Sequence, residues 1–399
     1  MKILVVSQRF YPENFRINDI VTELQNRGHQ ITVLCGLPNY PEGRIYKGYE
    51  KGKKRIEEYN GVKVIRVKEV ARRNNILFRF LNYYSFPFFA NNKINKLDHD
   101  FDVILVNQLS PIMMVQPAIK YKKKYKNKIL MYSMDLWPES LLAGGIRKDS
   151  IIYNFYRRVS KRIYNSMDSI LVSSRGHIDY IHELSNNRDI HYLPQYSEDI
   201  YGNICKFEKK NKVFTFVFAG NIGKAQNLNV LLEACRTISS IKQSMFKIIL
   251  VGAGSEKNFL EEKAKIYNLN NVEFVGKKSI EEVIHFYEIA DVMVVSLENS
   301  GYAKLTLPGK VQSYMAAGKP ILSFATGETN SIIEEAKCGL TSDSNSIDDL
   351  ANNIDKFISM TGKELEQFEN NSKIYYDRFF SRKSFMDIIE MRLRHLSIE

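Results

Sequence analysis

Short apolar runs alternate with helical patterns along this chain, and the same alternation occurs in both halves. Such alternation predicts parallel β-α-β units, because consecutive parallel strands need a crossover that usually contains a helix. The strand-like runs of the first half are Ile3 to Val6, Ile31 to Leu34, Val62 to Val67, Val103 to Val106, Ile129 to Tyr132 and Ile170 to Ser173. Those of the second half are Phe214 to Phe218, Lys247 to Val251, Val272 to Val275, Val292 to Ser296 and Pro320 to Ser323. The sequence therefore predicts an α/β fold of two Rossmann-like, doubly wound domains that face each other across a cleft.

The length of the chain and one polar stretch set the predicted domain boundaries. At 399 residues the chain exceeds the usual size of a single domain. The polar stretch between Pro194 and Lys212 contains the predicted linker. We therefore expect an acceptor-side domain over residues 1–197, a second domain over residues 198–374, and a helix over residues 375–399 that packs across both.

All of the excess positive charge lies in the first half. The formal charge is +12, and residues 1–200 hold 32 Lys and Arg against 20 Asp and Glu, while residues 201–399 hold 25 of each. A basic half beside a neutral one predicts that the first half faces a polyanion. Nucleic acid and an anionic membrane both fit this pattern, and a dispersed, solvated surface is the plainer alternative.

Two stretches of the first half bear on the membrane alternative. Residues Ile76 to Ala90 are rich in aromatic side chains and follow Arg72 and Arg73. This stretch is either an interfacial helix that lies on a membrane or a core helix whose end is marked by proline. Lys120 to Lys128 is the densest basic run. Near lipid each of its cations would add about 1 kcal/mol, although most such runs are solvated faces.

Cysteine spacing and apolar run length bear on the compartment. The four Cys residues are far apart and form neither a Cys-x-x-Cys pair nor a Cys/His cluster, so we expect no zinc site. The first residues read as a strand rather than a signal peptide, and no apolar run is long enough to span a bilayer. We therefore expect a cytoplasmic protein with reduced thiols.

Two glycine-marked turns in the second half predict an anion site. Ala219 to Asn227 follows an apolar strand and precedes a helical pattern, and Leu305 to Gln312 occupies the same position farther along the chain. Each turn places backbone N–H groups and a lysine, Lys224 or Lys310, where a helix is expected to begin. That end of a helix carries partial positive charge and unpaired donors, which favour a phosphate. Two such turns in one domain predict a diphosphate held from two sides.

Several motifs resemble those of one enzyme family. The turn Arg27-Gly28-His29 before the second strand, and the turns around Gly220 and Lys310, are similar to those of family-four glycosyltransferases of the GT-B fold. The resemblance covers nearly the whole chain. Five further stretches resemble a narrower branch that builds bacterial O-antigen and capsule and includes N-acetyl-L-fucosamine transferases: Tyr11 to Arg16, Leu37 to Gly43, Asp135 to Ser140, Leu193 to Asp199 and Tyr314 to Pro320.

This resemblance implies transfer of a sugar, an N-acetylated amino sugar, from a nucleotide diphosphate donor with retention of anomeric configuration. The second domain would bind the donor, a UDP-sugar, and the first would bind a lipid-linked (polyprenyl diphosphate) saccharide. Family members generally need neither a metal nor another cofactor, because protein cations and helix N-termini neutralise the leaving diphosphate. We therefore expect a peripheral protein on the inner face of the plasma membrane, attached through its basic first half and not bound to nucleic acid.

The lysines of the two turns are the expected diphosphate contacts. Charge builds on the leaving phosphate as the glycosidic bond breaks, so Lys224 and Lys310, beside Gly220 and Gly223, would stabilise the transition state more than the ground state. An ordinary exposed loop lysine is the plainer alternative for each. The turns that contain Gly252, Val275, Gly276 and Lys277 end two other strands and, by resemblance, line the nucleobase pocket. Close strand–helix packing explains such glycines nearly as well.

The chain departs from the family at its donor-binding positions. Many members carry Arg and Lys where this chain has Asn221 and Gln226. The family's E-x7-E motif is also missing, because the aligned positions hold Leu305 and Ser313. We therefore expect the donor sugar and ribose to be held by the backbone amides of Leu305, Thr306 and Leu307 and by Ser313. Asn221 remains a donor-binding candidate.

Five residues of the first domain are candidates for the reaction centre and the acceptor. Asp135 ends a strand at the predicted cleft, where it would bind the sugar or stabilise positive charge at the anomeric carbon; the alternative is a helix N-cap near Glu139. Trp137, the only Trp, would stack on a sugar ring or pack in the interior. Glu13, Asn14 and Arg16 follow the first strand, where Arg16 would hold a lipid diphosphate or belong to a surface helix.

Two other functions compete with sugar transfer. A nucleotide-sugar epimerase of GT-B architecture would keep the fold and would interconvert donors without an acceptor. A nucleic-acid-binding protein would use the basic first half, with aromatic residues between cations and a strong salt dependence. The second alternative leaves the two phosphate turns in the neutral half unexplained.

Overall fold

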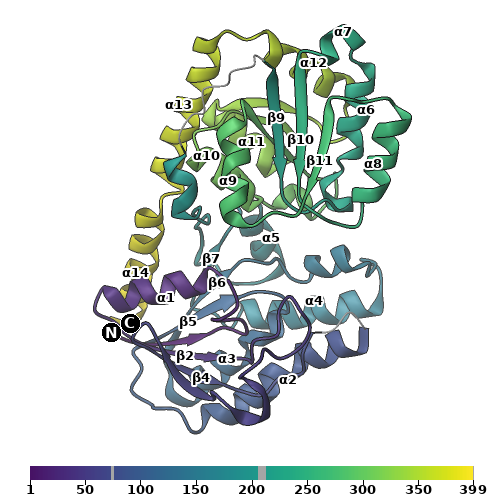
Figure 1. Cartoon of the computed structure of the whole chain (residues 1–399). Helices are drawn as coiled ribbons and strands as arrows, with labels where there is room; N and C mark the ends of the chain where they lie inside the picture. The colour runs from purple at the N-terminus through teal and green to yellow at the C-terminus, as the bar shows by residue number, and fades with distance from the viewer. Residues whose placement is uncertain (73–75, 205–212, 399) are drawn as a thin grey trace. The chain divides into compact units, whose positions relative to one another are not determined.

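A computed structural model describes residues 1–72, 76–204 and 213–398. The chain divides into two compact units: unit 1 comprises Met1–Leu193 and Met386–Glu399, and unit 2 comprises Pro194–Phe385 (Figure 1). Arg73, Cys205 and the end of the predicted linker lie outside the described part of the chain. The other three cysteines, Cys35, Cys235 and Cys338, are free and buried.

Unit 1 is built on an eight-stranded sheet in the order β3-β4-β2-β1-β5-β6-β7-β8. All of its strand pairs are parallel except β3 with β4. Its central strands are continuous apolar runs because helices cover both faces of the sheet. The strands are β1 (Lys2–Val6), β2 (Gln30–Cys35), β3 (Ile56–Tyr59), β4 (Val62–Arg66), β5 (Val103–Gln108), β6 (Lys128–Ser133), β7 (Ser169–Val172) and β8 (Ile190–Tyr192).

The helices of unit 1 connect these strands in the expected β-α-β manner. They are α1 (Ile17–Asn26), α2 (Ile76–Ile94), α3 (Gln116–Tyr125), α4 (Ile151–Tyr164), α5 (Gly176–Leu184) and most of α14 (Arg382–Ile398). Three short 3₁₀ turns are η1 (Glu50–Gly52), η2 (Ile112–Val115) and η3 (Glu139–Gly144). Helix α1 shows how the sequence makes such a helix pack in the core. It has one buried apolar stripe at helical spacing, formed by Ile17, Ile20, Val21 and Leu24.

Unit 2 contains a six-stranded, fully parallel sheet in the order β11-β10-β9-β12-β13-β14. Its strands are β9 (Phe214–Ala219), β10 (Phe246–Val251), β11 (Val272–Gly276), β12 (Val292–Ser296), β13 (Ile321–Phe324) and β14 (Gly339–Ser342). Its helical elements are η4 (Asp199–Asn203), η5 (Lys224–Gln226), α6 (Asn229–Thr237), α7 (Ser240–Gln243), α8 (Lys257–Ile266), α9 (Ile280–Ile289), η6 (Ala303–Leu305), α10 (Gly309–Ala316), α11 (Glu328–Ala336), α12 (Ile347–Ser359) and α13 (Gly362–Phe379).

Side chains along each strand of unit 2 alternate between two hydrophobic layers. Phe216 and Phe218 of β9 pack with α6, α8 and α12, while Val217 packs with α9, α10 and α11 on the other face (Figure 1). This period of two buries both faces of the sheet, as a doubly wound fold requires.

The strand order reverses once in each sheet, and that point is where such sheets bind ligands. In unit 2, β9 lies between β10 and β12; in unit 1, β1 lies between β2 and β5. The crevice outside the carboxyl ends of the strands at these switch points is the expected ligand position.

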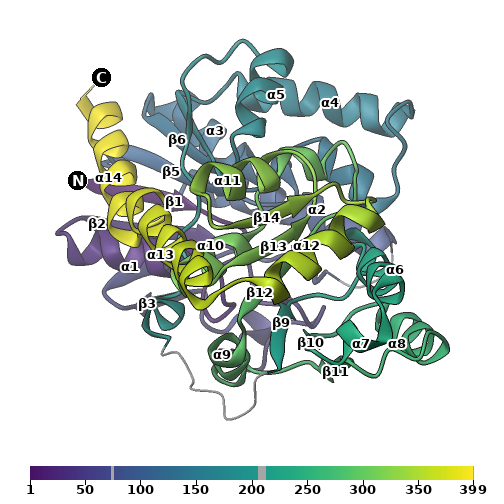
Figure 2. The same ribbon diagram turned by 90° about the horizontal axis from the view of Figure 1, so that it is seen from above.

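The predicted strands are confirmed, with three additions and one interrupted helix. Strands β3, β8 and β14 were not predicted; β3 pairs antiparallel with β4 through the turn Asn60-Gly61, a dipeptide typical of tight hairpins. One helix was predicted over residues 375–399, but this region contains the end of α13 and the separate helix α14 (Figure 2). The break occurs at Ser381, whose hydroxyl accepts the N–H of Ser384 in the manner of an N-cap.

Candidate functional site

Two loops meet at the carboxyl edge of the unit 2 sheet, at its switch point. One follows β9 and the other follows β12, and the N–H of Glu298 donates to the backbone oxygen of Ala225 at 2.8 Å. Tyr314 of α10 reaches the end of β9 as well, where its hydroxyl lies 3.3 Å from both the nitrogen and the oxygen of Ala219. The two glycine-marked turns predicted from the sequence are therefore brought together in space.

Close backbone packing holds the turns after β9, β10 and β11 together. The N–H of Gly220 donates to the oxygen of Val251, and the N–H of Gly252 donates to the oxygen of Gly276, each at 2.9 Å. A Cβ atom on Gly252 would lie 1.8 Å from the oxygen of Gly220, so only glycine fits at this position. Val275 is half-buried and Lys277 is exposed beside this turn.

Lys310 is the most unusual side chain at this edge. It is the second residue of α10, and its amine nitrogen is buried, although the residue as a whole is partly exposed. The nitrogen lies 3.8 Å from the centroid of the Phe218 ring and has no hydrogen-bond partner among the described residues. A Cβ atom on Gly220 would lie 3.0 Å from it. Burial lowers the pKa of Lys310 to about 7, because the charged form loses its hydration.

Lys224 occupies a different environment from Lys310. It is exposed and begins the 3₁₀ turn η5, whereas helix α6 begins five residues later, at Asn229. The prediction that both lysines begin a helix is therefore met in full by Lys310, while Lys224 begins only a 3₁₀ turn. The N–H of Gly223 is bonded to the side-chain oxygen of Gln226 at 3.2 Å, so this donor is already satisfied.

The two positions that commonly hold cations in the resembling family are paired with each other here. The amide nitrogen of Asn221 donates to the side-chain oxygen of Gln226 at 3.2 Å. Asn221 is exposed and Gln226 is half-buried. This pair shapes the turn without supplying positive charge.

The predicted sugar-binding segment is partly engaged by its own backbone. The N–H groups of Leu305 and Thr306 donate to the oxygens of Tyr302 and Ala303, each at 3.1 Å, and Leu307 is buried. The hydroxyl of Ser313 accepts from the hydroxyl of Ser197 at 3.2 Å and lies 3.4 Å from the oxygen of Gly309. These contacts fix the segment ahead of α10.

In unit 1, Asp135 lies just past the end of β6 and is half-buried. Its carboxylate accepts the N–H of Ser110, which follows β5, at 2.8 Å. The alternative N-cap role is not found, because Pro138 occupies the cap position of η3. Asp135 therefore links two loops at the carboxyl edge of the unit 1 sheet.

Trp137 is only 1% exposed, so no face of its ring is open for stacking in this structure. Its indole N–H donates to the hydroxyl of Ser110 at 2.9 Å. The ring meets Tyr83 and Tyr156 edge to face, at centroid distances of 6.1 and 5.6 Å. These contacts place Trp137 in the interior beneath α2 and α4.

Glu13 belongs to a buried charged cluster at the carboxyl edge of unit 1. One nitrogen of Arg9 lies 3.3 Å from Glu13 and 2.9 Å from Glu69. Glu13 also accepts the N–H groups of Asn39 and Tyr40, at 2.8 and 2.6 Å. Burial raises the pKa of Glu13, and it raises the pKa of Glu69 to about 7.

The other two acceptor candidates after β1 are placed differently. Asn14 is exposed, and Arg16 occupies the cap position of α1 with its side chain 3.9 Å from Asp19. Glu13, Asn14 and Arg16 therefore share one loop, but only Glu13 enters the buried cluster.

The sequence matches a known family in its second half. Residues 203–375 match the family model described as glycosyl transferases group 1. The chain is 27% identical to the probable glycosyltransferase WbjE of Pseudomonas aeruginosa over 73% of this chain and 74% of that protein. It is 22% identical to the putative colanic acid biosynthesis glycosyl transferase WcaI of Escherichia coli, over 80% and 82% of the two chains.

A solved structure extends the likeness to the whole chain. Anabaena Alr3699/HepE in complex with UDP superposes with a TM-score of 0.71 at 14% sequence identity, over 99% of each chain. At such low sequence identity the superposition shows only the fold. This fold is GT-B, as predicted. Together these similarities support a GT-B glycosyltransferase.

Three residues of the buried charged cluster of unit 1 were not singled out from the sequence. Arg9, Asn39 and Glu69 follow β1, β2 and β4, and all three are buried. The sequence did contain a signal for them, because each is a polar residue that follows a predicted parallel strand. The carboxyl ends of neighbouring parallel strands lie at the same edge of the sheet.

One acidic cluster of unit 1 lies away from the carboxyl edge of its sheet. Asp98, Asp100 and Asp102 precede β5, where Asp98 pairs with Lys63 and Asp100 pairs with Lys2. Among the described residues, no group of three or more His, Cys, Asp or Glu is arranged to hold a metal ion. The described helices also include none with the length and apolar character that a bilayer-spanning segment needs.

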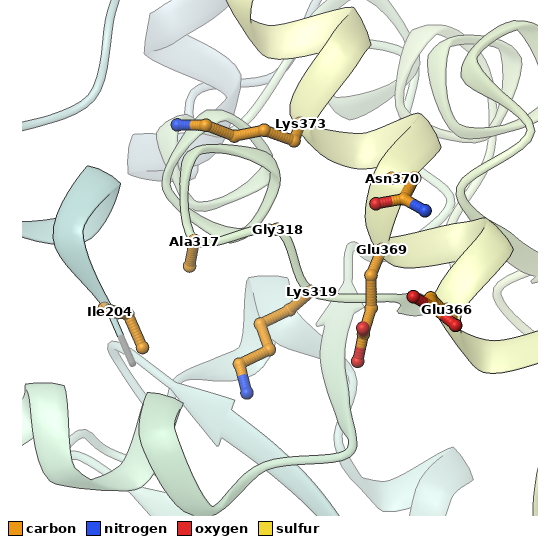
Figure 3. Close-up of a pocket in the computed structure, with 8 residues that line it drawn as sticks. All are labelled: Ile204, Ala317, Gly318, Lys319, Glu366, Glu369, Asn370 and Lys373. Carbon is orange, nitrogen blue, oxygen red and sulfur yellow. The ribbon is translucent and has the colours of Figure 1, made fainter. Parts of the chain in front are cut away.

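A pocket of about 250 Å³ lies at the opposite, amino edge of the unit 2 sheet (Figure 3). Lys319, which precedes β13, donates from its amine to the oxygens of Ala290 and Glu288, at 2.9 and 3.4 Å. These carbonyls lie at the carboxyl end of α9, where a cation is favourable. The pocket is lined by Ile204, Ala317, Gly318, Lys319, Glu366, Glu369, Asn370 and Lys373.

Proposed function

We propose that the chain is a retaining, metal-independent family-four glycosyltransferase that moves an N-acetylated amino sugar from a UDP donor to a lipid-linked saccharide. The product belongs to surface polysaccharide, such as capsule or O-antigen. Three likenesses support this proposal: the bacterial branch that the motifs resemble, the colanic acid biosynthesis named for WcaI, and the UDP bound by HepE. The protein works at the inner face of the plasma membrane, where a lipid-linked acceptor is available.

The observation that carries the proposal is the unpaired amine of Lys310. An amine that is buried without a partner costs free energy, and an anionic ligand removes that cost by pairing with it. The nitrogen lies beside Gly220 at the switch point of unit 2. This is the position where a doubly wound sheet receives a nucleotide.

In the proposed reaction the bond between the anomeric carbon and the oxygen of the β-phosphate breaks, and a bond from an acceptor hydroxyl oxygen to that carbon forms on the same face. The hydroxyl proton passes to the leaving diphosphate. Lys310 and Lys224 stabilise the charge on that diphosphate. The turns of Gly252, Val275, Gly276 and Lys277 receive the base, and Asn221, the segment from Leu305 to Leu307 and Ser313 hold the ribose and sugar.

On the acceptor side the proposal uses the carboxyl edge of unit 1. Asp135 faces the reacting sugar, and Asn14 and Arg16 bind the acceptor diphosphate. Glu13 is buried in its cluster and acts by holding the turn at Asn39 and Tyr40 through its bonds to their N–H groups. Trp137 supports the site from the interior.

A thermal-shift experiment with UDP, GDP and ADP in the presence of EDTA tests the donor site. UDP should raise the melting temperature of the wild type, because a ligand that binds only the folded state stabilises it. Lys310→Ala should lose about tenfold to hundredfold in UDP affinity, since charge-assisted bonds contribute about 1.5–3 kcal/mol. Lys337→Ala, an exposed lysine of unit 2, is the control and should behave as wild type.

The outcomes separate the competing functions. A UDP shift that appears only with magnesium, or that survives in both Lys310→Ala and Lys224→Ala, would overturn the site. Interconversion of UDP-sugars without an acceptor would identify an epimerase. Salt-sensitive binding of nucleic acid without a UDP shift would identify the third alternative.

A further inference from the structure

Two helices of unit 1 expose large apolar side chains to solvent. On α2 these are Phe80, Leu81 and Phe88, of which Phe88 is 62% exposed. On α4 they are Ile151, Ile152 and Phe155, of which Ile151 is 89% exposed. Large exposed apolar side chains that gather on one surface mark an interaction site, whereas single ones are ordinary.

The exposed side chains of α2 form a stripe opposite its buried face. Phe80 and Phe88 are exposed, and the half-buried Tyr84 lies between them at a spacing of four residues, so the three lie above one another on the helix. The buried residues Asn82, Phe86, Ala90 and Ile94 occupy the other side and face the core. The buried side agrees with the core-helix interpretation, although Pro87 lies inside the helix and does not mark its end. The membrane interpretation stays a prediction.

A direct contact joins the stripes of α2 and α4. The hydroxyl of Tyr84 lies 2.9 Å from the hydroxyl of Tyr156, and the two helices lie next to each other in Figure 1. Tyr156 directly follows Phe155, and the rings of these two residues meet at 5.2 Å. Tyr84 is half-buried and Tyr156 is buried, so this contact packs the two helices against each other. We call the six exposed apolar residues of these two adjacent helices the α2–α4 face.

The charged side chains on the two helices of the α2–α4 face are all positive. Neither α2 nor α4 contains Asp or Glu. The exposed cations of these helices are Arg79, Arg157, Arg158, Lys161 and Arg162. Asp149, which precedes α4, is paired with Arg147. An apolar stripe flanked by cations without acids fits a surface that is apolar inside and anionic outside.

The densest basic run of the sequence behaves differently. Lys122 pairs with Asp168 at 2.6 Å, and Lys128 lies 3.7 Å from the same carboxylate. Lys120 donates to the backbone oxygen of Asn91 at 2.7 Å. Much of this charge is therefore engaged within unit 1, and the cations of α4 are the better candidates for an external anion.

We propose that the α2–α4 face docks unit 1 onto an anionic phospholipid bilayer. The apolar side chains enter the interface between headgroups and acyl chains, and the cations of α4 contact the lipid phosphates. The chain then lies on the membrane surface. This proposal concerns attachment and holds whether or not the chain transfers a sugar.

Vesicle cosedimentation with the full chain tests the proposal. The probes are vesicles of phosphatidylcholine alone and vesicles that also contain phosphatidylglycerol. Wild type should bind the anionic vesicles at least about tenfold more tightly, because each cation near the surface contributes about 1 kcal/mol. The triple variant Phe88→Ser, Ile151→Ser and Phe155→Ser should lose that binding, and Arg158→Gln with Arg162→Gln should abolish the preference for anionic lipid.

Matched controls come from unit 2. Ile241 and Ile266 are 79% and 75% exposed, and Phe259 is exposed as well, so their triple substitution by Ser removes a similar apolar surface. Lys356→Gln with Lys363→Gln removes two exposed charges. Both controls should bind vesicles as wild type does. Circular dichroism melting should show that all variants remain folded.

Three results would overturn the proposal. One is wild-type binding that does not distinguish the two vesicle types. Another is an equal loss of binding in the unit 2 controls. The last is a wild-type dimer that the Phe88, Ile151 and Phe155 substitutions dissociate without any change in vesicle binding, because this would assign the face to a second copy of the chain.

Discussion

The amine nitrogen of Lys310 lies 3.8 Å above the ring of Phe218, and this ring is its main neighbour in place of a carboxylate. A cation over an aromatic face gains some electrostatic stabilisation, but less than it loses on leaving water. The result is a pKa lowered to about 7. The described residues therefore leave the positive charge of this amine poorly satisfied.

This relationship predicts a pH dependence of UDP binding. In the free protein Lys310 loses its proton as pH rises through about 7, whereas a bound diphosphate would raise its pKa and keep it charged. Binding above pH 7 must then take up a proton, so UDP affinity should fall as pH rises, by at most about tenfold per pH unit. Isothermal titration calorimetry between about pH 7 and 9 measures this slope.

Lys310→Met provides the comparison for the pH series. The variant keeps an apolar stem over Phe218 but has no proton to gain, so its UDP affinity should be weaker and nearly constant over the same range. Equal slopes in wild type and Lys310→Met would show that another group takes up the proton. A wild-type affinity that rises with pH would contradict the assignment outright.

Gly252→Ala should destabilise unit 2 and disturb the turn that follows β10. The added Cβ would lie 1.8 Å from the oxygen of Gly220, a backbone atom that cannot move without breaking the hydrogen bonds between these turns. We expect a loss of at least about 1–3 kcal/mol in the free energy of unfolding, as for other overpacked sites. Urea denaturation measures the change. Gly362→Ala, where a Cβ would meet nothing within 4 Å, should leave stability nearly unchanged.

The sheet architecture could be predicted because parallel strands buried on both faces are continuous apolar runs. The strands that were missed lack that signal. β3 is mostly polar because it pairs antiparallel at an edge, and β14 begins with Gly339 and carries Thr341 and Ser342. The hairpin of β3 and β4 was nevertheless marked by Asn60-Gly61, whose meaning is local and can be read without the fold.

The candidate site was predictable where it depends on local order along the chain. Lys310 directly follows a glycine at the start of a helix, and such placement follows from the sequence. Its burial over Phe218 could not be foreseen, because that contact joins residues about ninety positions apart. The same reason hid the Arg9–Glu69 pair and the enclosure of Trp137 by Tyr83 and Tyr156.

Arg9→Met should be strongly destabilising. Arg9 is the only cation paired with both Glu13 and Glu69 among the described contacts, and all three side chains are buried. Its removal would leave two buried carboxylates without a counter-ion, which typically costs about 3–5 kcal/mol. Urea denaturation should show this loss, and the double variant Arg9→Met with Glu69→Gln should recover part of it. A loss below about 1 kcal/mol would mean that the cluster is not held by charge.

Glu69→Gln should change how stability depends on pH. The pKa of Glu69 is raised from 4.5 to about 7 in the folded chain, so the folded state holds more protons than the unfolded state between these values. Stability contributed by this group is therefore present below about pH 4.5 and is lost as pH rises through about 7. Glutamine removes the titration, so the variant should gain about 2–3 kcal/mol in the free energy of unfolding relative to wild type between pH 5 and pH 8.

Urea denaturation at a series of pH values measures this difference. Glu58→Gln, which replaces an exposed carboxylate of β3, is the control and should show the same pH dependence as wild type. Parallel curves for wild type and Glu69→Gln would show that Glu69 is ionised throughout this range and that Arg9 fully compensates its burial.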